Sequence, residues 1–171
     1  MVLIMLQLRD LPTKEILKKF EQRYPEVDIA TVLIFLKFLR VSTDLSNALD
    51  GFLLQHGLLQ GRWWVLILLM REENQTSTPS LLAEKSGVSR ATMTRLVDGL
   101  ERDGLIKRRF DEQDRRSFSV SLTSAGQKKL DEVMPDYYQR VNQSMAGLGA
   151  KQFQQLDEIL DAIQTGIRAF E

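Results

Sequence analysis

The chain has 171 residues, of which 43% are hydrophobic, so it is long and apolar enough to fold around one substantial core, or around a core plus a dimerisation arm. It contains no cysteine and one histidine, which excludes disulfides and thiolate metal sites and argues against an imidazole-rich one, so we expect no metal and no cofactor. Its 23 basic and 23 acidic side chains cancel, which argues against a uniformly sticky polycation.

Three helices are predicted in the first part of the chain. The first covers residues 13–22, before the Tyr24-Pro25 step; a long one covers residues 29–55 and ends at His56-Gly57; a buried one covers residues 63–73. No apolar run reaches the ~20 residues that span a bilayer. Residues 1–6 lack a basic leader and a small-residue cleavage site. We therefore expect a cytoplasmic protein with no membrane partner.

Residues 78–104 are typical of two short helices joined by a tight turn. Thr78 caps the first helix and Pro79 suits its first position. Its apolar face is Leu81, Leu82 and Ala83. Ser89 caps the second helix, which ends at Gly104. The second helix has one apolar stripe, formed by Met93, Leu96, Val97 and Leu100.

The other side of the second helix suits the major groove of DNA. Small residues allow close approach, hydroxyls can bond base edges or phosphates, and arginine can bind guanine with two parallel hydrogen bonds. We expect the DNA contacts here to be Ser89, Arg90, Thr92, Thr94 and Arg95. The alternative is a helix pair that merely packs, with both arginines as solvated surface charges.

A β-hairpin is predicted directly after Gly104. Residues 105–110 and 118–123 have the pattern of strands, and the polar segment 111–117 connects them. An arginine at such a tip can enter a minor groove, and Asp114 is close enough in sequence to pair with Arg116 and fix its direction. Residues 85–116 hold nine basic and six acidic side chains, so this segment alone is net positive. Helix, turn, helix and hairpin together indicate a winged helix-turn-helix that binds DNA.

These segments resemble the MarR family of bacterial transcription regulators. The similarity lies in residues 81–101 with Gly104-Leu105-Ile106, in the wing pattern Asp114-x-Arg116 followed by Leu122-Thr123-Ser124-Ala125-Gly126, and upstream in Gly57-Leu58 and Trp63-x-Val65-Leu66; it covers about residues 30 to 170. The resemblance implies a homodimer that binds a palindromic double-stranded DNA operator, mostly represses, and is released by a small aromatic or phenolic effector.

The resemblance also implies roles for single residues. Asp114, Arg115 and Arg116 would form the DNA-contacting wing tip, with Arg116 in the minor groove. Thr94 and Arg108 match positions that contact an aromatic carboxylate in some relatives. The chain departs from the family pattern at Leu59, where many members have a helix-capping Thr. The lack of cysteine excludes the thiol-based peroxide sensing of one branch.

Aromatic side chains are further candidates for lining a ligand pocket. They are Phe52, Trp63, Trp64, Tyr137 and Tyr138. Adjacent residues on a helix point about 100° apart, so Trp63 and Trp64 cannot both face one pocket. We expect Trp63 in the core, and Trp64 or a tyrosine near the domain hinge at the ligand.

Two helices are predicted after the wing. The first covers residues 124–148 and contains Pro135. The second carries a heptad seam for dimerisation: Phe153, Leu156, Leu160, Ile163, Ile167 and Phe170. The same seam can instead pack against the chain's own first helix.

The predicted fold is mainly α with a small β wing. It comprises N-terminal helices for dimerisation and linkage (residues 1–57), a winged helix-turn-helix (residues 58–123) and C-terminal dimerisation helices (residues 124–171). The alternative function is a winged-helix module that binds protein. We do not expect an enzyme, because the sequence has no phosphate-binding Gly-rich loop and no Ser-His-acid or metal-ligand set.

Overall fold

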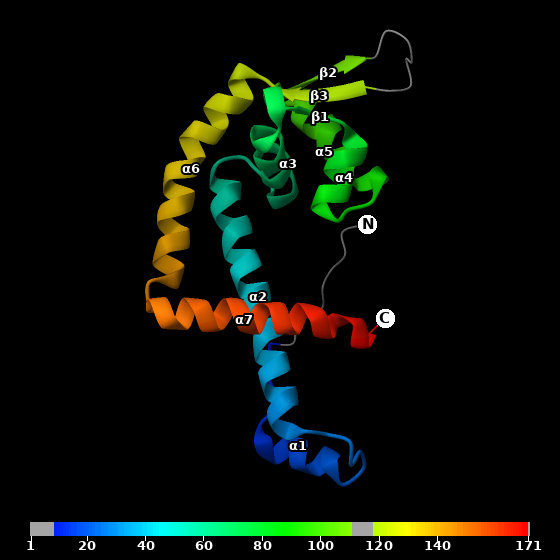
Figure 1. The fold of residues 1–171 in the computed structure, drawn as a ribbon, viewed down its shortest axis with the longest axis vertical. Helices are drawn as coiled ribbons and strands as arrows, with labels where there is room; N and C mark the ends of the chain where they lie inside the picture. The colour runs from blue at the N-terminus through cyan, green and yellow to red at the C-terminus, as the bar shows by residue number, and fades with distance from the viewer. Residues whose placement is uncertain (1–8, 111–117, 171) are drawn as a thin grey trace.

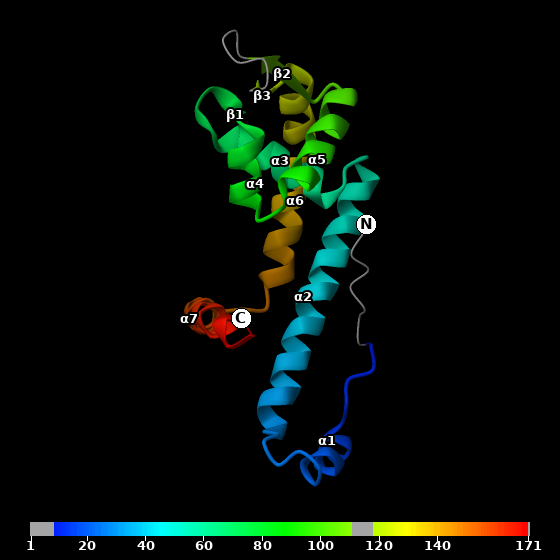
Figure 2. The ribbon, with the colours of Figure 1, turned by 90° about the vertical axis from the view of Figure 1, so that its right-hand side faces the viewer.

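A computed structural model describes residues 9–110 and 118–170. Its helical cluster and sheet stand at one end, and two long helices, α2 (Ile29–Gln55) and α6 (Ser124–Met145), lead away from them (Figure 1). A third helix, α7 (Ala150–Gly166), runs across α2, and Figure 2 views it nearly along its axis. The short helix α1 (Lys14–Glu21) packs beside the start of α2. No helix within the described ranges is long and apolar enough to cross a membrane.

The helix starts follow from side-chain caps that the sequence displays. Thr13 accepts from the amide of Ile16 at the start of α1, and Asp28 accepts from the amide of Thr31 at 2.9 Å at the start of α2. These caps satisfy amides that have no partner within the helix. At the other end of α2, His56 is the C-cap and Gly57 has a φ of 71°, as the sequence predicted.

The third helix begins earlier than predicted. Helix α3 covers Gln60–Arg71 and starts after Leu59, which provides no side-chain cap. The predicted start at Trp63 was therefore wrong by one turn, because the apolar pattern marks only the buried part of this helix. Trp63, Val65, Leu66 and Leu69 are fully buried, so α3 forms the centre of the core, as expected for Trp63.

The helix-turn-helix consists of α4 (Pro79–Ser86) and α5 (Arg90–Arg102). Thr78 and Ser89 cap them through the amides of Leu81 and Thr92, and Gly87 between them has a φ of 66°. Leu82 and Ala83 are buried as predicted, but Leu81 is 37% exposed, because only two of the three consecutive residues can face α3 and α5. On α5, Met93, Val97 and Leu100 are fully buried and Leu96 is partly buried.

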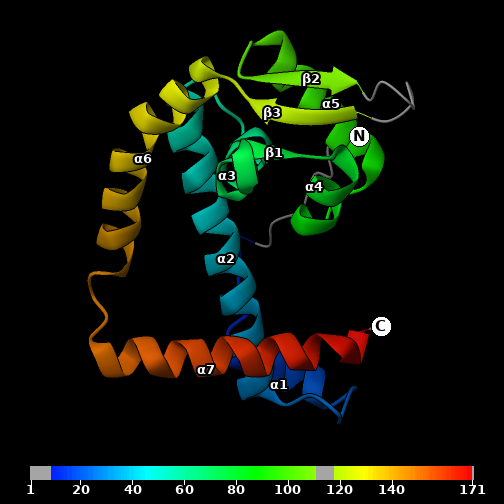
Figure 3. The same cartoon turned by 45° about the horizontal axis from the view of Figure 1, so that its top comes forward.

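The wing contains a three-stranded antiparallel sheet with the order β1-β3-β2. Strand β2 (Ile106–Phe110) pairs with β3 (Phe118–Leu122) over their whole described length (Figure 3). The third strand, β1 (Thr76–Ser77), follows the short 3-10 helix η1 (Glu73–Gln75) and pairs with Ser121 and Val120. The predicted fold class, mainly α with a small β wing, is confirmed.

The C-terminal helices are shorter than predicted. Helix α6 ends at Met145 rather than near residue 148, and it accommodates Pro135 in its interior. Helix α7 ends at Gly166, and the 3-10 helix η2 (Ile167–Phe170) follows it. The predicted seam therefore continues in α-helical geometry only as far as Ile163, because Ile167 and Phe170 lie in the tighter turn.

Candidate nucleic-acid interface

The first turns of α5 present the predicted contact residues to solvent. Ser89, Arg90, Thr92, Thr94 and Arg95 are all exposed. Ser89 and Thr92 join their hydroxyls at 3.0 Å, and the Thr94 hydroxyl donates to the carbonyl oxygen of Arg90 at 2.9 Å. Among the described residues neither Arg90 nor Arg95 forms an ion pair, so both guanidinium groups are available for a ligand on this face.

Helix α3 packs against the side of α5 that faces the core. The Arg62 guanidinium lies against Gly99, and its Nη1 is 2.6 Å from the Asp103 carboxylate at the end of α5. A Cβ on Gly99 would come within 2.4 Å of the guanidinium, so this close packing depends on glycine. The exposed face of α5 is therefore presented by a helix that is fixed along its opposite side.

Arg108 connects the wing to α5. Its Nη2 donates to the Asp98 carboxylate, and its Nε lies 3.3 Å from Glu101 Oε2 as an ion pair without hydrogen-bond geometry. Its Cζ stands 4.9 Å from the centre of the Phe118 ring, within the range of a cation–π contact. The predicted ligand residue Arg108 thus has its charged end engaged by two carboxylates and a ring.

The predicted wing-tip residues Asp114, Arg115 and Arg116 lie outside the described residues. The described part of the hairpin reaches as far as the cross-strand pair Phe110 and Phe118, whose ring centres are 5.7 Å apart. Phe110 is 59% exposed, whereas Phe118 is partly buried and packs against the core.

A cavity of about 350 Å³ lies between α2 and α6. It is lined by Leu45, Ala48, Leu49, Phe52, Tyr137, Arg140, Val141, Ser144 and Met145. Arg140 places its Cζ 4.8 Å from the centre of the Phe52 ring, and its Nε is 3.0 Å from Asp136 Oδ1. Burial raises the pKa of the Tyr137 phenol, and its ring packs against Trp63 at 5.3 Å.

This cavity differs from the predicted ligand set. Trp64, on α3, is 37% exposed, and neither it nor Thr94 or Arg108 lines the cavity. Phe52 and Tyr137 were among the aromatic candidates, but Arg140 was missed. Its position three residues after Tyr137, on the same face of one helix, was the signal that could have identified it.

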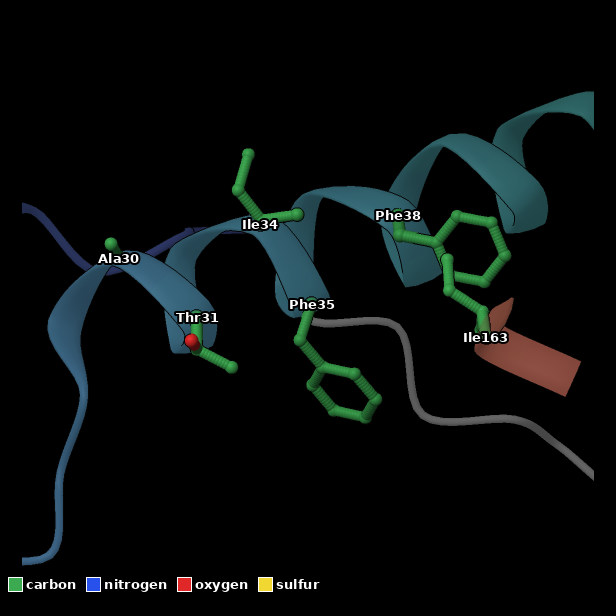
Figure 4. A pocket seen from close by; sticks show the side chains of 6 residues that line it. All are labelled: Ala30, Thr31, Ile34, Phe35, Phe38 and Ile163. Carbon is green, nitrogen blue, oxygen red and sulfur yellow. The ribbon is translucent and has the colours of Figure 1, made fainter. Parts of the chain in front are cut away.

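The predicted dimerisation residues remain largely uncovered within one chain. Leu156 is partly buried, whereas Phe153, Leu160, Ile163, Ile167 and Phe170 are exposed, Phe170 by 82%. The seam meets α2 where Phe170 stacks on Phe35 with ring centres 5.9 Å apart. A second cavity of about 430 Å³ lies between the two helices and is lined by Ala30, Thr31, Ile34, Phe35 and Phe38 of α2 and by Ile163 of α7 (Figure 4). Packing against the chain's own first long helix therefore accounts for only part of the seam.

The fold, with its exposed polar helix and attached hairpin, defines a winged helix-turn-helix protein. Solved structures agree with it. A MarR family transcriptional regulator from Streptomyces coelicolor, Sco3205 in complex with DNA, superposes with a TM-score of 0.75 at 22% identity, over 82% of this chain and 89% of that one. AbsC, another MarR family regulator from the same organism, gives 0.69 at 21% identity, over 94% and 99%.

Sequence comparison is more specific than the fold. A sequence model of the MarR family matches residues 56–117. The transcriptional regulator PapX of Escherichia coli is 30% identical over 66% of this chain and 69% of its own length. The transcriptional repressor YetL of Bacillus subtilis is 29% identical over 82% and 84%. The chain belongs to the MarR family of transcriptional regulators.

Proposed function

We propose that the protein is a homodimeric repressor that binds a palindromic double-stranded DNA operator through α5 and the wing. The observation that carries this proposal is the outer face of α5, where hydroxyls stand beside two arginines that form no ion pair with any described residue. Such a helix fits the major groove, and its N-terminus also favours phosphate. In this proposal residues 58–123 are the DNA-binding domain, and residues 1–57 and 124–171 provide the linking and dimerisation helices.

Relatives support the repressor assignment. YetL of B. subtilis and MprA of E. coli are transcriptional repressors, and MprA is 29% identical over 86% of this chain and 84% of its own length. Sco3205 and the Mycobacterium tuberculosis regulator MosR were both solved with DNA. The alternative, a winged-helix module that binds protein, would require large apolar anchors on α5, whereas its outer face carries hydroxyls and arginines.

The test of DNA binding uses an operator found by selection from random duplexes. Fluorescence anisotropy at two salt concentrations should show tight binding that weakens steeply with salt, because neutralised phosphates release counterions. Arg95→Ala and Arg116→Ala should each weaken specific binding by about 1–3 kcal/mol. Arg23→Ala is the matched control, because Arg23 is an exposed arginine far from α5. Failure to select any sequence, with salt-insensitive binding to a protein partner instead, would favour the interaction module.

Dimerisation is proposed to bury the seam of α7 and the apolar side of α2. A monomer would leave Leu160, Ile163 and Ile167 exposed together with Ile34 and Phe35, and soluble monomers rarely keep such contiguous apolar surface. Ile163→Asp should convert the dimer to monomers in light scattering. Gln155→Asp on the same helix, which adds the same charge away from the seam, should leave the dimer intact. A dimer that survives Ile163→Asp would remove α7 from the interface.

The effector is proposed to bind in the cavity between α2 and α6. Its volume of about 350 Å³ lies within the usual range for small-molecule sites, and its lining combines apolar side chains with one guanidinium, that of Arg140. A small aromatic or phenolic anion could stack on Phe52 and Tyr137 and compete with Asp136 for Arg140. The set Trp64, Thr94 and Arg108 is the second candidate, because family relatives place an aromatic carboxylate at positions matching Thr94 and Arg108.

Salicylate is the probe that distinguishes these two sites. It should loosen the wild-type protein from its operator, and Arg140→Met should abolish this response while leaving DNA affinity unchanged. Trp64→Phe is the control for the cavity and should respond like the wild type. A response that survives Arg140→Met but is lost in Thr94→Val would assign the effector to the second set. Operator binding that is unmoved by salicylate in every variant would discard this ligand class.

A further inference from the structure

The two strands of the hairpin differ in how far the apolar core packs against them. Ile106 and Leu122 lie opposite each other in the sheet, and both are buried. The next pair on the same face is Arg108 and Val120, and the last is Phe110 and Phe118, where Phe110 is mostly exposed. Val120 is fully buried and Phe118 packs against the core, so β3 keeps apolar packing along its described length, whereas on β2 apolar burial on this face ends at Ile106.

At this point Arg108 makes contacts on three sides. Its side chain is only 19% exposed, it pairs with Asp98 and Glu101 one turn apart on α5, and it lies over Phe118 of the facing strand. Among the described residues it is the side chain of β2 nearest the tip that forms an ion pair with α5. Its guanidinium thus joins both strands of the hairpin to α5.

The geometry needs an arginine. A planar guanidinium can bond two carboxylates and stack on a ring at the same time, whereas a lysine ammonium is a compact charge on a flexible chain. Asp98 also lies one turn after Arg95 on the exposed side of α5, where an unpaired carboxylate would repel phosphate. Pairing with Arg108 neutralises the Asp98 carboxylate and orients this side chain towards the wing.

We propose that Arg108 is a positioning residue that sets the direction of the wing relative to α5, so that wing and helix reach DNA as one rigid unit. The proposal rests on the proposed DNA-binding function, and it assigns to Arg108 a role other than direct contact with DNA or effector. It predicts that the contribution of the wing to binding depends on Arg108, whereas the contribution of α5 does not.

The first test measures the hairpin directly, without DNA. The chain has no cysteine, so spin labels can be placed at Glu84→Cys on α4 and Arg109→Cys on β2, in dimers diluted with unlabelled subunits. Electron-spin distance measurements should give a narrow distribution for the otherwise wild-type chain. Arg108→Met should broaden it, Glu101→Gln should broaden it less, and Arg108→Lys should restore it only in part. An unchanged distribution in Arg108→Met overturns the proposal, whether or not the protein binds an operator.

The second test is a double-mutant cycle on the operator. In the wild-type background Arg116→Ala should weaken binding about 5- to 150-fold, and in the Arg108→Met background by less than about twofold. Arg95→Ala should cost the same in both backgrounds. Equal effects of Arg116→Ala in both backgrounds would show that Arg108 contributes only stability or charge, and would overturn the proposal. No effect of Arg116→Ala in either background, with Arg95→Ala still damaging, would remove the wing from DNA binding and the proposal with it.

Discussion

The carbonyl oxygen of Leu105 occupies the space that a side chain on Gly126 would need, since a Cβ at Gly126 would lie 2.1 Å from it. Leu105 precedes β2, and Gly126 stands in the first turn of α6. The same ideal Cβ would lie 2.8 Å from a methyl group of Leu122. The wing and the helix that leaves it therefore meet at a contact between main chains, which leaves no room for a larger residue.

Gly126→Ala is expected to destabilise the fold by about 1–3 kcal/mol or more, because the clashing atom belongs to the backbone and cannot rotate away. Urea unfolding at fixed protein concentration measures this loss. Gly51→Ala is the matched control, since Gly51 lies inside α2 with nothing within 4 Å of its ideal Cβ. It should stabilise by roughly 0.5–1 kcal/mol through helix propensity. Equal changes in unfolding free energy for Gly126→Ala and Gly51→Ala would contradict the close contact between Gly126 and the Leu105 carbonyl oxygen.

Thr123 joins the same two segments by hydrogen bonds. Its hydroxyl oxygen accepts from the amide of Gly126 at 3.0 Å, and its hydroxyl donates to the carbonyl oxygens of Gly104 and Leu105 at 2.7 and 3.0 Å. Thr123→Val keeps the shape and removes these bonds, so it should cost about 1–2 kcal/mol of stability. Thr123→Ser retains the hydroxyl and should cost much less. A valine variant as stable as the serine variant would contradict this role.

Gly99→Ala is expected to behave differently from Gly126→Ala. The atoms that its Cβ would meet are the end of the Arg62 side chain, which can move away. The change should therefore cost under about 1 kcal/mol, because it gives up a partly exposed ion pair and gains helix propensity.

If Arg62 moves away in Gly99→Ala, its ion pair with Asp103 should be lost. In a double-mutant cycle, Asp103→Asn should lower the unfolding free energy of the wild type slightly and that of Gly99→Ala not at all. If Asp103→Asn has the same effect in both backgrounds, Arg62 has kept its partner and the expected movement has not occurred.

Local signals in the sequence predicted most of the fold. The caps at Thr78 and Ser89 act on amides three residues away, and glycine at position 87 adopts the positive φ that ends α4, so these boundaries could be identified from neighbouring residues alone. The start of α3 could not be, because Leu59 gives no capping signal. The prediction of a continuous helix along the heptad seam was wrong for a related reason. The apolar spacing continues through Ile167, but the backbone there forms the 3-10 helix η2.

The parts of the site that were missed depend on tertiary approach. Nothing in the spacing of Asp98 and Arg108 shows that β2 turns back along α5, and only that approach brings the guanidinium to the two carboxylates. The cavity likewise needs α2 and α6 side by side, which places Phe52 under Arg140 across 88 residues of chain. Residue type identified the aromatic candidates, but their shared pocket follows from how the two helices pack.

The stability that the Asp28 cap contributes at the start of α2 should depend on pH. The amide of Thr31 donates to the Asp28 carboxylate and holds its pKa below the ordinary value. A group whose pKa is lower in the folded state stabilises the fold fully above its unfolded pKa of about 4, and this contribution is lost as the pH falls through the folded-state pKa. Stability should therefore decline on the acid side.

Asp28→Asn is the variant that tests this dependence, because asparagine caps a helix without titrating. The thermal midpoint of the wild type, relative to that of Asp28→Asn, should fall as the pH is lowered from 6 towards 3. Circular dichroism at 222 nm follows both midpoints. A difference that stays constant over this range would show that the Asp28 carboxylate contributes no acid-dependent stability.

The length of α2 turns small angles into large displacements. Its 27 residues rise by about 40 Å, so tilting it by about 5° about its far end would carry the helix-turn-helix roughly 3.5 Å sideways. The cavity lies between α2 and α6, close to the end of α2 that connects to the helix-turn-helix domain. If the proposed effector binds there, opening the cavity by the thickness of one aromatic ring would move the helix-turn-helix by a similar distance, which is enough to misalign α5 with the major groove.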